Sequence, residues 1–233
     1  MKVFAIADLH LSASGEKPMD VFGPEWRDHR GKIERNWGEA VAPDDVVLLC
    51  GDLSWAMTLD EARPDLDFID SLPGEKYFIR GNHDYWYSRP GLVHAAVGAS
   101  MHPVRYDAHV RGGVAVCGVR GWLWPSHPEY DPATDEKHWR RAVIRLGMSL
   151  ESLRRLDWEV AVAMFHFPPC SPSGQTELCR MIADAGVSRA VYGHVHGADA
   201  RNAFEGLMDG VEYRCVSADH VGFAPVLLLE QRG

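Results

Sequence analysis

The chain has 233 residues, 46% of them hydrophobic, and a formal net charge of −9. This length and apolar content suffice for a sizeable core without disulfides or oligomerisation, so we expect residues 1–233 to form a single domain. The acidic balance and the absence of a basic run disfavour a nucleic-acid polymer as a partner, because such partners require a basic face that neutralises phosphates.

The apolar stretches and the cysteines indicate in which cellular compartment the protein is expected. The N-terminal apolar run is interrupted by Asp8 and is too short for the core of a signal peptide. No other apolar run approaches the ~18 residues of a membrane span. Five cysteines occur without CxxC pairing, and Cys50 and Cys117 lie in apolar, strand-like runs where a small buried residue is expected. We therefore expect a cytoplasmic protein without a membrane partner.

Apolar strand-like runs alternate with helical patterns along the chain. Strands are predicted, in chain order, over residues 2–7, 46–50, 76–80, 114–119, 160–165, 190–192, 212–217 and 225–230. Helices are predicted over residues 26–40, 58–71, 135–156 and 175–185. Most helices follow strands, which indicates an α/β fold, and the strand-dense ends of the chain suggest two sheets packed together.

Five of the predicted strands are followed directly by residues that ligate metals. These are Asp8 and His10, then Asp52, Asn82 and His166, and finally His194 and His196. Ligands bind at the carboxyl ends of the strands in open α/β sheets, so these side chains are expected to converge although they come from most of the chain length.

The donor set indicates two metal ions. Seven oxygen or nitrogen donors without sulfur exceed the need of one ion and suit two ions, roughly 3.5–4 Å apart, that share a bridging carboxylate. Mixed imidazole and carboxylate ligands favour Mn, Fe or Zn over Ca or Mg. Gly51, Gly81 and Gly193, beside the donors, are expected to allow sharp turns and close backbone approach.

These motifs together carry a family resemblance. Asp8-x-His10, Gly51-Asp52, Gly81-Asn82-His83-Asp84, His166 and Gly193-His194-x-His196 resemble, in order, the signature of the calcineurin-like metallophosphoesterases. The resemblance spans residues 8 to 196. It implies a four-layer α/β/β/α sandwich with two packed mixed β-sheets and a dimetal site at the strand ends.

The resemblance also implies a role for each site residue. One metal would be held by Asp8, His10, Asp52 and His196, and the other by Asp52, Asn82, His166 and His194, with Asp52 as the bridge. The reaction would be hydrolysis of a phosphate mono- or diester of a small molecule by a hydroxide bridging two divalent metals, with Mn²⁺ expected to serve in vitro. His83 would act as general acid, and Asp84 would orient the His83 ring.

Four other readings compete with this one. Amidohydrolases and metallo-β-lactamase-like enzymes open with an HxH motif, whereas this chain opens with Asp8-x-His10. A non-catalytic metal-binding scaffold of the same fold would typically have lost a ligand or His83. A nuclease of the same superfamily is discouraged by the acidic charge. A lipid-precursor pyrophosphatase tends to carry arginine at the His83 position.

Several other residues have open roles. The aromatic stretch from Trp122 to His138 is either a substrate-facing lid or a loop fixed to the core by its tryptophans. Arg80 and Arg120 are candidates for contacting substrate phosphate, but the sequence does not separate them from ordinary exposed arginines. His127 and His220 lie in loops within reach of the site mouth, and the remaining histidines, at positions 29, 94, 102, 109 and 138, are expected to be structural or exposed.

Overall fold

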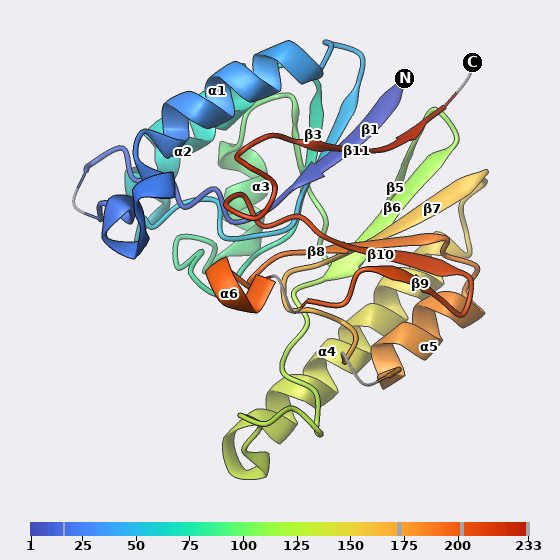
Figure 1. The fold of residues 1–233 in the computed structure, drawn as a ribbon. Coiled ribbons are helices and arrows are strands. Elements are labelled where there is room, and N and C mark those ends of the chain that lie inside the picture. Colours follow the sequence, from blue (N-terminus) through green and yellow to red (C-terminus); the bar gives the residue numbers. More distant parts are fainter. Residues whose placement is uncertain (16, 172–173, 201–202, 232–233) are drawn as a thin grey trace.

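The computed structural model describes residues 1–15, 17–171, 174–200 and 203–231, which form two mixed β-sheets flanked by helices (Figure 1). The first sheet has the order β11 (Val226–Glu230), β1 (Lys2–Ile6), β2 (Val46–Leu49), β3 (Glu75–Phe78), β4 (Met101–Pro103). The second has the order β5 (Ala108–Arg111), β6 (Val114–Val119), β7 (Val160–Phe165), β8 (Arg189–Tyr192), β10 (Val211–Cys215), β9 (Gly206–Met208).

Most neighbouring strands run parallel, and this direction positions the site. Within each sheet the central strands pair in parallel, and only β11, β5 and β9 pair antiparallel at the edges. An isolated bridge between Ala7 and Ser217 joins the segments that follow β1 and β10. The carboxyl ends of the parallel strands of both sheets therefore open toward a shared edge.

Helices cover the outer face of each sheet (Figure 1). The first sheet is covered by α1 (His29–Ala40), α2 (Leu59–Ser71) and α3 (Pro90–Ala96), and the second by α4 (Pro132–Leu153) and α5 (Glu177–Asp184). The one-turn helix α6 (Gly197–Ala200) follows the last of the predicted metal ligands. No helix within the described ranges is long and apolar enough to cross a membrane.

The core shows the alternation expected of strands that are buried on both faces. In β1, Phe4 and Ile6 belong to the apolar cluster shared with α1 and α2, whereas Val3 and Ala5 belong to a cluster between the sheets. That inter-sheet cluster also holds Val116 from β6, and a third cluster fills the space between the second sheet and α4. Side chains of successive strand residues point to opposite faces, so three apolar layers separate four structural layers. The predicted α/β fold with two packed mixed β-sheets is confirmed.

All eight predicted strands and all four predicted helices are present, with ends shifted by a few residues. Helix α4 begins at Pro132 rather than at residue 135, because the Asp131 side chain accepts the Ala133 N–H and proline suits the first helical position. The sequence missed β4, β5 and β9, which are strands of three or four residues, and the short helices α3 and α6. All five cysteines are buried and free, as predicted for Cys50 and Cys117.

Candidate metal centre

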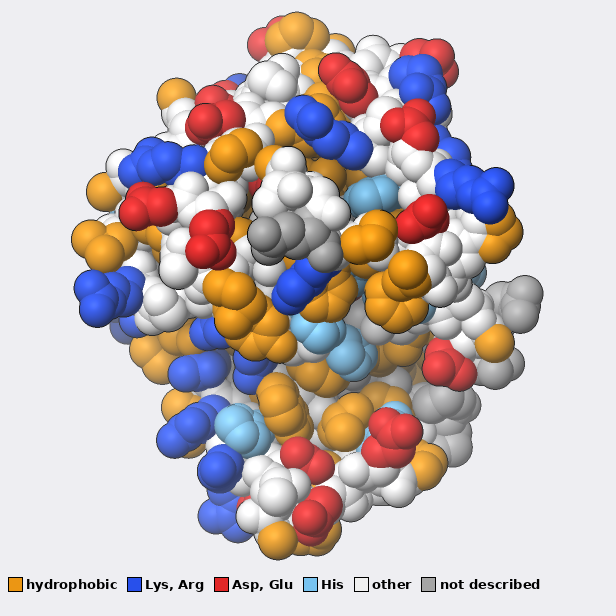
Figure 2. Space-filling view, turned by 90° about the vertical axis from the view of Figure 1, so that its left-hand side faces the viewer, with side chains coloured by type: hydrophobic (Ala, Val, Ile, Leu, Met, Phe, Trp, Pro, Cys, Tyr) orange, Lys and Arg blue, Asp and Glu red, His pale blue; other side chains and the backbone are white. Residues whose placement is uncertain are grey.

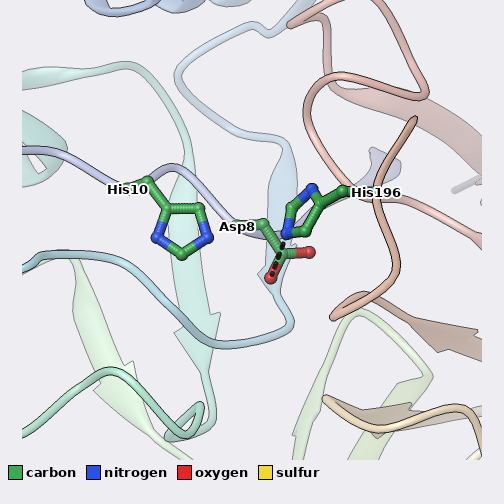
Figure 3. A group of neighbouring side chains, drawn as sticks. All are labelled: Asp8, His10 and His196. Carbon is green, nitrogen blue, oxygen red and sulfur yellow. Dashed lines mark ion pairs between the residues drawn. The ribbon is translucent and has the colours of Figure 1, made fainter. Parts of the chain in front are cut away.

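The strand ends bring predicted ligands from both sheets into one cluster. Asp52 Oδ2 lies 3.4 Å from His166 Nε2 and 3.9 Å from His10 Nε2. Asp8 Oδ1 lies 3.9 Å from His196 Nε2, and Figure 3 shows His10 and His196 on either side of the Asp8 carboxylate. Asp8 shares one compact group of potential ligand atoms with His10 and His196, and a second with Asp52 and His166. Asp52 thus lies between His10, which belongs to one expected ligand set, and His166, which belongs to the other.

The remaining two predicted donors extend this cluster. Asn82 Oδ1 lies 2.5 Å from His166 Nε2 and 3.0 Å from His194 Nδ1. Asn82 follows β3 and His194 follows β8, so these two side chains bring together strand ends of the two sheets. All seven predicted donors are therefore contiguous.

The backbone at the cluster is strained. Four of the seven candidate ligands have left-handed backbone conformations, with φ of 58° at Asp8, 44° at His10, 54° at Asp52 and 73° at His194. Such conformations cost roughly 1–2 kcal/mol for a residue with a side chain and persist only where surrounding contacts enforce them. Here the N–H of Asp8 donates to Gly51 O at 2.9 Å and that of His10 donates to Asp52 O at 3.0 Å. Strain of this kind collects at functional sites.

The glycines of the motifs are required by close packing. A Cβ at Gly81 would overlap the Asp52 side chain and its backbone N, and a Cβ at Gly193 would overlap the Asp8 carboxylate. At Gly51, where φ is +93°, a Cβ would lie 2.9 Å from His166 Nδ1. These contacts confirm the prediction that glycines allow the backbone to approach the ligands closely.

Hydrogen bonds fix the orientation of two candidate ligand rings. His166 Nδ1 lies 3.0 Å from Cys50 O, and His196 Nδ1 lies 2.8 Å from Asp219 Oδ1. An Nδ1–H that donates to these acceptors leaves the Nε2 lone pair of each ring directed at the Asp8 and Asp52 carboxylates. Partners of this type orient metal-binding histidines and raise their basicity.

Asp219 is a site residue that the sequence analysis missed. It follows β10, and its second oxygen accepts the Gly197 N–H at 2.9 Å. The rule that identified the other candidates, a polar residue after a buried strand, also applies to Asp219. The neighbouring His220, whose role was open, instead places Nε2 3.4 Å from Glu205 Oε2.

Asp219→Asn is expected to weaken metal binding by about 10- to 100-fold, because the His196 ring loses the carboxylate that orients it. Burial lowers the pKa of His196, but the Asp219 hydrogen bond and the Asp8 charge outweigh this and raise it to about 8. The variant should therefore also lower the His196 pKa in the metal-free protein, as followed by NMR titration. Glu205→Gln, which alters the carboxylate beside His220, is the control. Equal metal affinities in Asp219→Asn and wild type would contradict this role.

Asp84 organises the loop that carries Asp52. Its buried carboxylate accepts five N–H groups at 2.7 to 3.3 Å, from the backbone of Asp52, Leu53, Ser54 and Gly81 and from the Trp86 indole. None of the described hydrogen bonds or ion pairs joins Asp84 to the His83 ring, so the expected orienting contact is replaced by this backbone role. The physical reason is that four converging backbone N–H groups occupy both carboxylate oxygens.

His83 lies at the mouth of the cluster. Its backbone N–H donates to Asp52 Oδ1 at 2.8 Å, and its ring packs 4.4 Å from the Trp55 ring. Nδ1 of His83 is buried without a hydrogen-bond partner among the described residues. The ring lines a cavity of about 290 Å³ together with His10 and His196. A small molecule in this cavity would contact both His83 and the candidate ligands.

The protonation states of His166 and His194 fit metal ligation. Burial lowers the pKa of His166 to about 3 and that of His194 to about 2, so both rings are neutral, the form that binds metal. Burial raises the pKa of Asp8 to about 7, with a smaller contribution from the Asp52 charge, and burial also raises the pKa of Asp52 to about 6. Asp8 Oδ1 is buried without a hydrogen-bond partner in the described part of the chain. Divalent cations would supply the missing opposite charge, and the donor set fits them.

The aromatic segment after β6 lines a further cavity, of about 690 Å³. Trp122, Trp124 and His127 form one side of it, and His194 and His196 reach it from the metal cluster. His127 is thus placed beside the candidate ligands. Because α4 begins at Pro132, the last part of the predicted 122–138 loop is helical, and the role of the remainder as a substrate lid stays a prediction.

Two packed mixed sheets that gather carboxylates and imidazoles at their strand ends form a candidate metal-binding site. The chain belongs to the calcineurin-like phosphoesterase family, whose sequence profile matches residues 1–198.

Two curated relatives are phage proteins. The Gene 66 protein of Mycobacterium phage L5 is 29% identical over 103 residues, which cover 44% of this chain and 42% of that protein. The Gene 66 protein of Mycobacterium phage D29 is 37% identical over 86 residues, covering 35% and 40% respectively. The chain therefore matches less than half the length of these relatives.

Solved structures share the fold over nearly the whole chain. A phosphopantetheinyl hydrolase from Mycobacterium tuberculosis superposes with a TM-score of 0.61 at 19% identity, covering 100% of this chain and 98% of that one. A protein of unknown function from Aquifex aeolicus superposes with a TM-score of 0.52 at 16% identity, covering 97% and 95%. At these identities the similarity establishes the fold alone.

Proposed function

We propose that the protein hydrolyses a phosphate mono- or diester of a small molecule with the help of two divalent metal ions. The observation that carries this proposal is the convergence of seven oxygen and nitrogen donors from five strand ends into one partly buried cluster. Such ions supply a hydroxide nucleophile near neutral pH and positive charge for the phosphoryl oxygens. The name of one structural neighbour, a phosphopantetheinyl hydrolase, is compatible with hydrolysis of a phosphate ester.

The ligands fall into two proposed sets that share Asp52. Asp8, His10 and His196 hold one ion, and Asn82, His166 and His194 hold the other. This division is supported by the position of Asp52 Oδ2, within 3.9 Å of His10 Nε2 and 3.4 Å of His166 Nε2. Mn, Fe and Zn all suit such a mixed set, and we expect Mn²⁺ to serve in vitro.

His83 is proposed as the general acid that protonates the leaving oxygen. It lines the cavity beside the ligands, and the hydrogen bond from its N–H to Asp52 Oδ1 couples its position to the proposed bridging carboxylate. The contact with the tilted Trp55 ring limits rotation of the His83 ring. Asp84 forms no described hydrogen bond with the His83 ring and instead shapes the loop that carries Asp52.

The five free, buried cysteines fit a reducing compartment, and we propose that the protein is cytoplasmic.

The test is an assay of chelator-treated protein reloaded with Mn²⁺, using bis-p-nitrophenyl phosphate and p-nitrophenyl phosphate. We expect turnover that requires the metal, and the preferred ester sorts diesterase from monoesterase. Mn²⁺-loaded protein that turns over neither these esters nor a panel of phosphorylated metabolites would contradict the proposal and favour the non-catalytic scaffold.

A further inference from the structure

A cavity of about 400 Å³ at the ends of β3 and β6 is lined by an unusual number of arginines. Its basic lining residues, which we call the arginine pocket, are Arg80, Arg105, Arg120, His138, Arg141 and Arg145. No aspartate or glutamate is among the described residues that line it. In a chain with 33 acidic and 24 basic residues, a cavity with five arginines and no carboxylate is a marked local reversal of charge.

The arginine pocket adjoins the metal centre through two strand ends. Arg80 follows β3 and is separated from Asn82 only by Gly81. Arg120 follows β6, and its carbonyl accepts the His166 N–H at 3.0 Å. The Arg120 charge is also close enough to lower the pKa values of both Asp52 and His166, although burial dominates both shifts.

The other wall of the arginine pocket is one face of α4. His138, Arg141 and Arg145 are spaced by three and four residues, so they share a face of the helix. Figure 2 shows Lys and Arg side chains gathering to one side of the hollow in which histidines are visible. The pocket therefore lies between a helix face and the strand ends that carry the site.

The charges of these arginines are not neutralised by ion pairs within the described part of the chain. None of the ion pairs between described residues includes any of the five, whereas Arg140 on the same helix pairs with Glu136. The Nε of Arg80 is buried without a hydrogen-bond partner in the described part of the chain. Burial and the charges of Arg80 and Arg145 lower the pKa of Arg120 to about 10, so it stays charged at neutral pH.

Aromatic faces hold two of the guanidinium groups in place. The Arg145 guanidinium carbon lies 4.7 Å from the centre of the Tyr106 ring, and that of Arg120 lies 4.7 Å from the Trp122 ring. Cation–π contacts of this kind orient a guanidinium without neutralising it. Oriented, uncompensated arginines are the arrangement that binds phosphate oxygens, often through two hydrogen bonds per guanidinium.

We propose that the arginine pocket binds a second phosphate group of the substrate, so that the natural substrate is a small molecule with one phosphate at the metal centre and another between α4 and the strand ends. The assignment of this group to the substrate rests on the proposed function, whereas the ability of the pocket to bind an organic phosphate does not. The second phosphate would supply the ion-pair partner that no described residue provides.

The ability of the pocket to bind an organic phosphate is tested by isothermal titration of the full chain in EDTA with adenosine 3′,5′-bisphosphate and the unphosphorylated nucleoside adenosine. We expect the bisphosphate to bind at least about tenfold more tightly, the effect of one or more charged hydrogen bonds. The double variant R141Q/R145Q should abolish this preference. R140Q, on the same helix but ion-paired outside the pocket, should retain it.

The assignment of the second phosphate to the substrate is tested with Mn²⁺-loaded protein. R141Q/R145Q should lower kcat/KM for a hydrolysable bisphosphate by about tenfold or more while leaving that for p-nitrophenyl phosphate unchanged. Equal losses for both esters, or an equal loss in R140Q, would overturn the inference by showing a general charge effect. Variant-sensitive binding of a single-stranded oligonucleotide without any preference for the bisphosphate would also overturn it. Selective binding without any hydrolysis would support the pocket and count against the proposed function.

Discussion

Asp52→Asn is expected to lower kcat/KM by at least roughly a thousandfold, the largest effect of any single substitution that we foresee. The carboxylate lies between the two proposed ligand sets, with Oδ2 3.4 Å from His166 Nε2 and 3.9 Å from His10 Nε2. A carboxamide has nearly the same shape but no negative charge, so it weakens the hold on both ions at once. Bound metal should fall to one ion or fewer per chain, as measured by elemental analysis after gel filtration.

A matched control for Asp52→Asn exists at the opposite end of β2. Asp45 precedes β2 whereas Asp52 follows it, and the buried Asp45 carboxylate accepts the backbone N–H groups of Lys2 and Ala42. Asp45→Asn removes a buried negative charge at the far end of the strand, so it should reduce stability while leaving metal content and kcat per folded molecule near wild type. If Asp52→Asn retained two ions and near-normal turnover, Asp52 would not be the shared ligand.

His83→Gln is expected to lower kcat by about 10²- to 10⁴-fold for alkyl phosphate esters, the usual contribution of a general acid. The fall should be much smaller for p-nitrophenyl esters, because p-nitrophenolate leaves readily without a proton. Metal content should stay at the wild-type value. The hydrogen bond from His83 to the proposed ligand Asp52 comes from the backbone N–H, which the substitution keeps. The measurement is a comparison of kcat for the two ester types in both proteins.

The control for His83→Gln is His94→Gln, an exposed position on α3. It should behave as wild type with every ester. Loss of bound metal in His83→Gln, or an equal fall in kcat for alkyl and p-nitrophenyl esters, would show that His83 supports the site structurally and does not donate the proton.

The clustering of the candidate ligands was predictable because each follows a strand that the sequence marks clearly. The runs before Asp8, Asp52 and His166 are apolar at nearly every position, and such runs form strands buried on both faces. Strands of that kind pair in parallel, so their carboxyl ends share one edge. The proposed role of each residue, in contrast, came from the family resemblance.

Features that depend on the direction of a side chain were not predictable. Asp84 follows His83 directly, but its carboxylate turns toward the backbone of the Asp52 loop, where several N–H groups converge. Asp219 could have been named as a candidate because it follows a strand-like run, but its contact with His196, far away in the chain, could not. Residue order does not encode either contact.

The arginine pocket shows the same limit on a larger scale. The sequence marked Arg80 and Arg120 as candidates without separating them from exposed arginines. Their significance appears only when one face of α4 places Arg141 and Arg145 opposite the ends of β3 and β6. Net charge averages over the whole surface, so an acidic chain can still contain a strongly basic cavity.

The most direct test of the central claim, a dinuclear centre built from the strand ends, is anomalous diffraction from crystals grown with Mn²⁺. We predict two anomalous peaks, roughly 3.5–4 Å apart, with Asp52 between them. Asp8, His10 and His196 should surround one peak, and Asn82, His166 and His194 the other. A single peak, or peaks away from these side chains, would contradict the account.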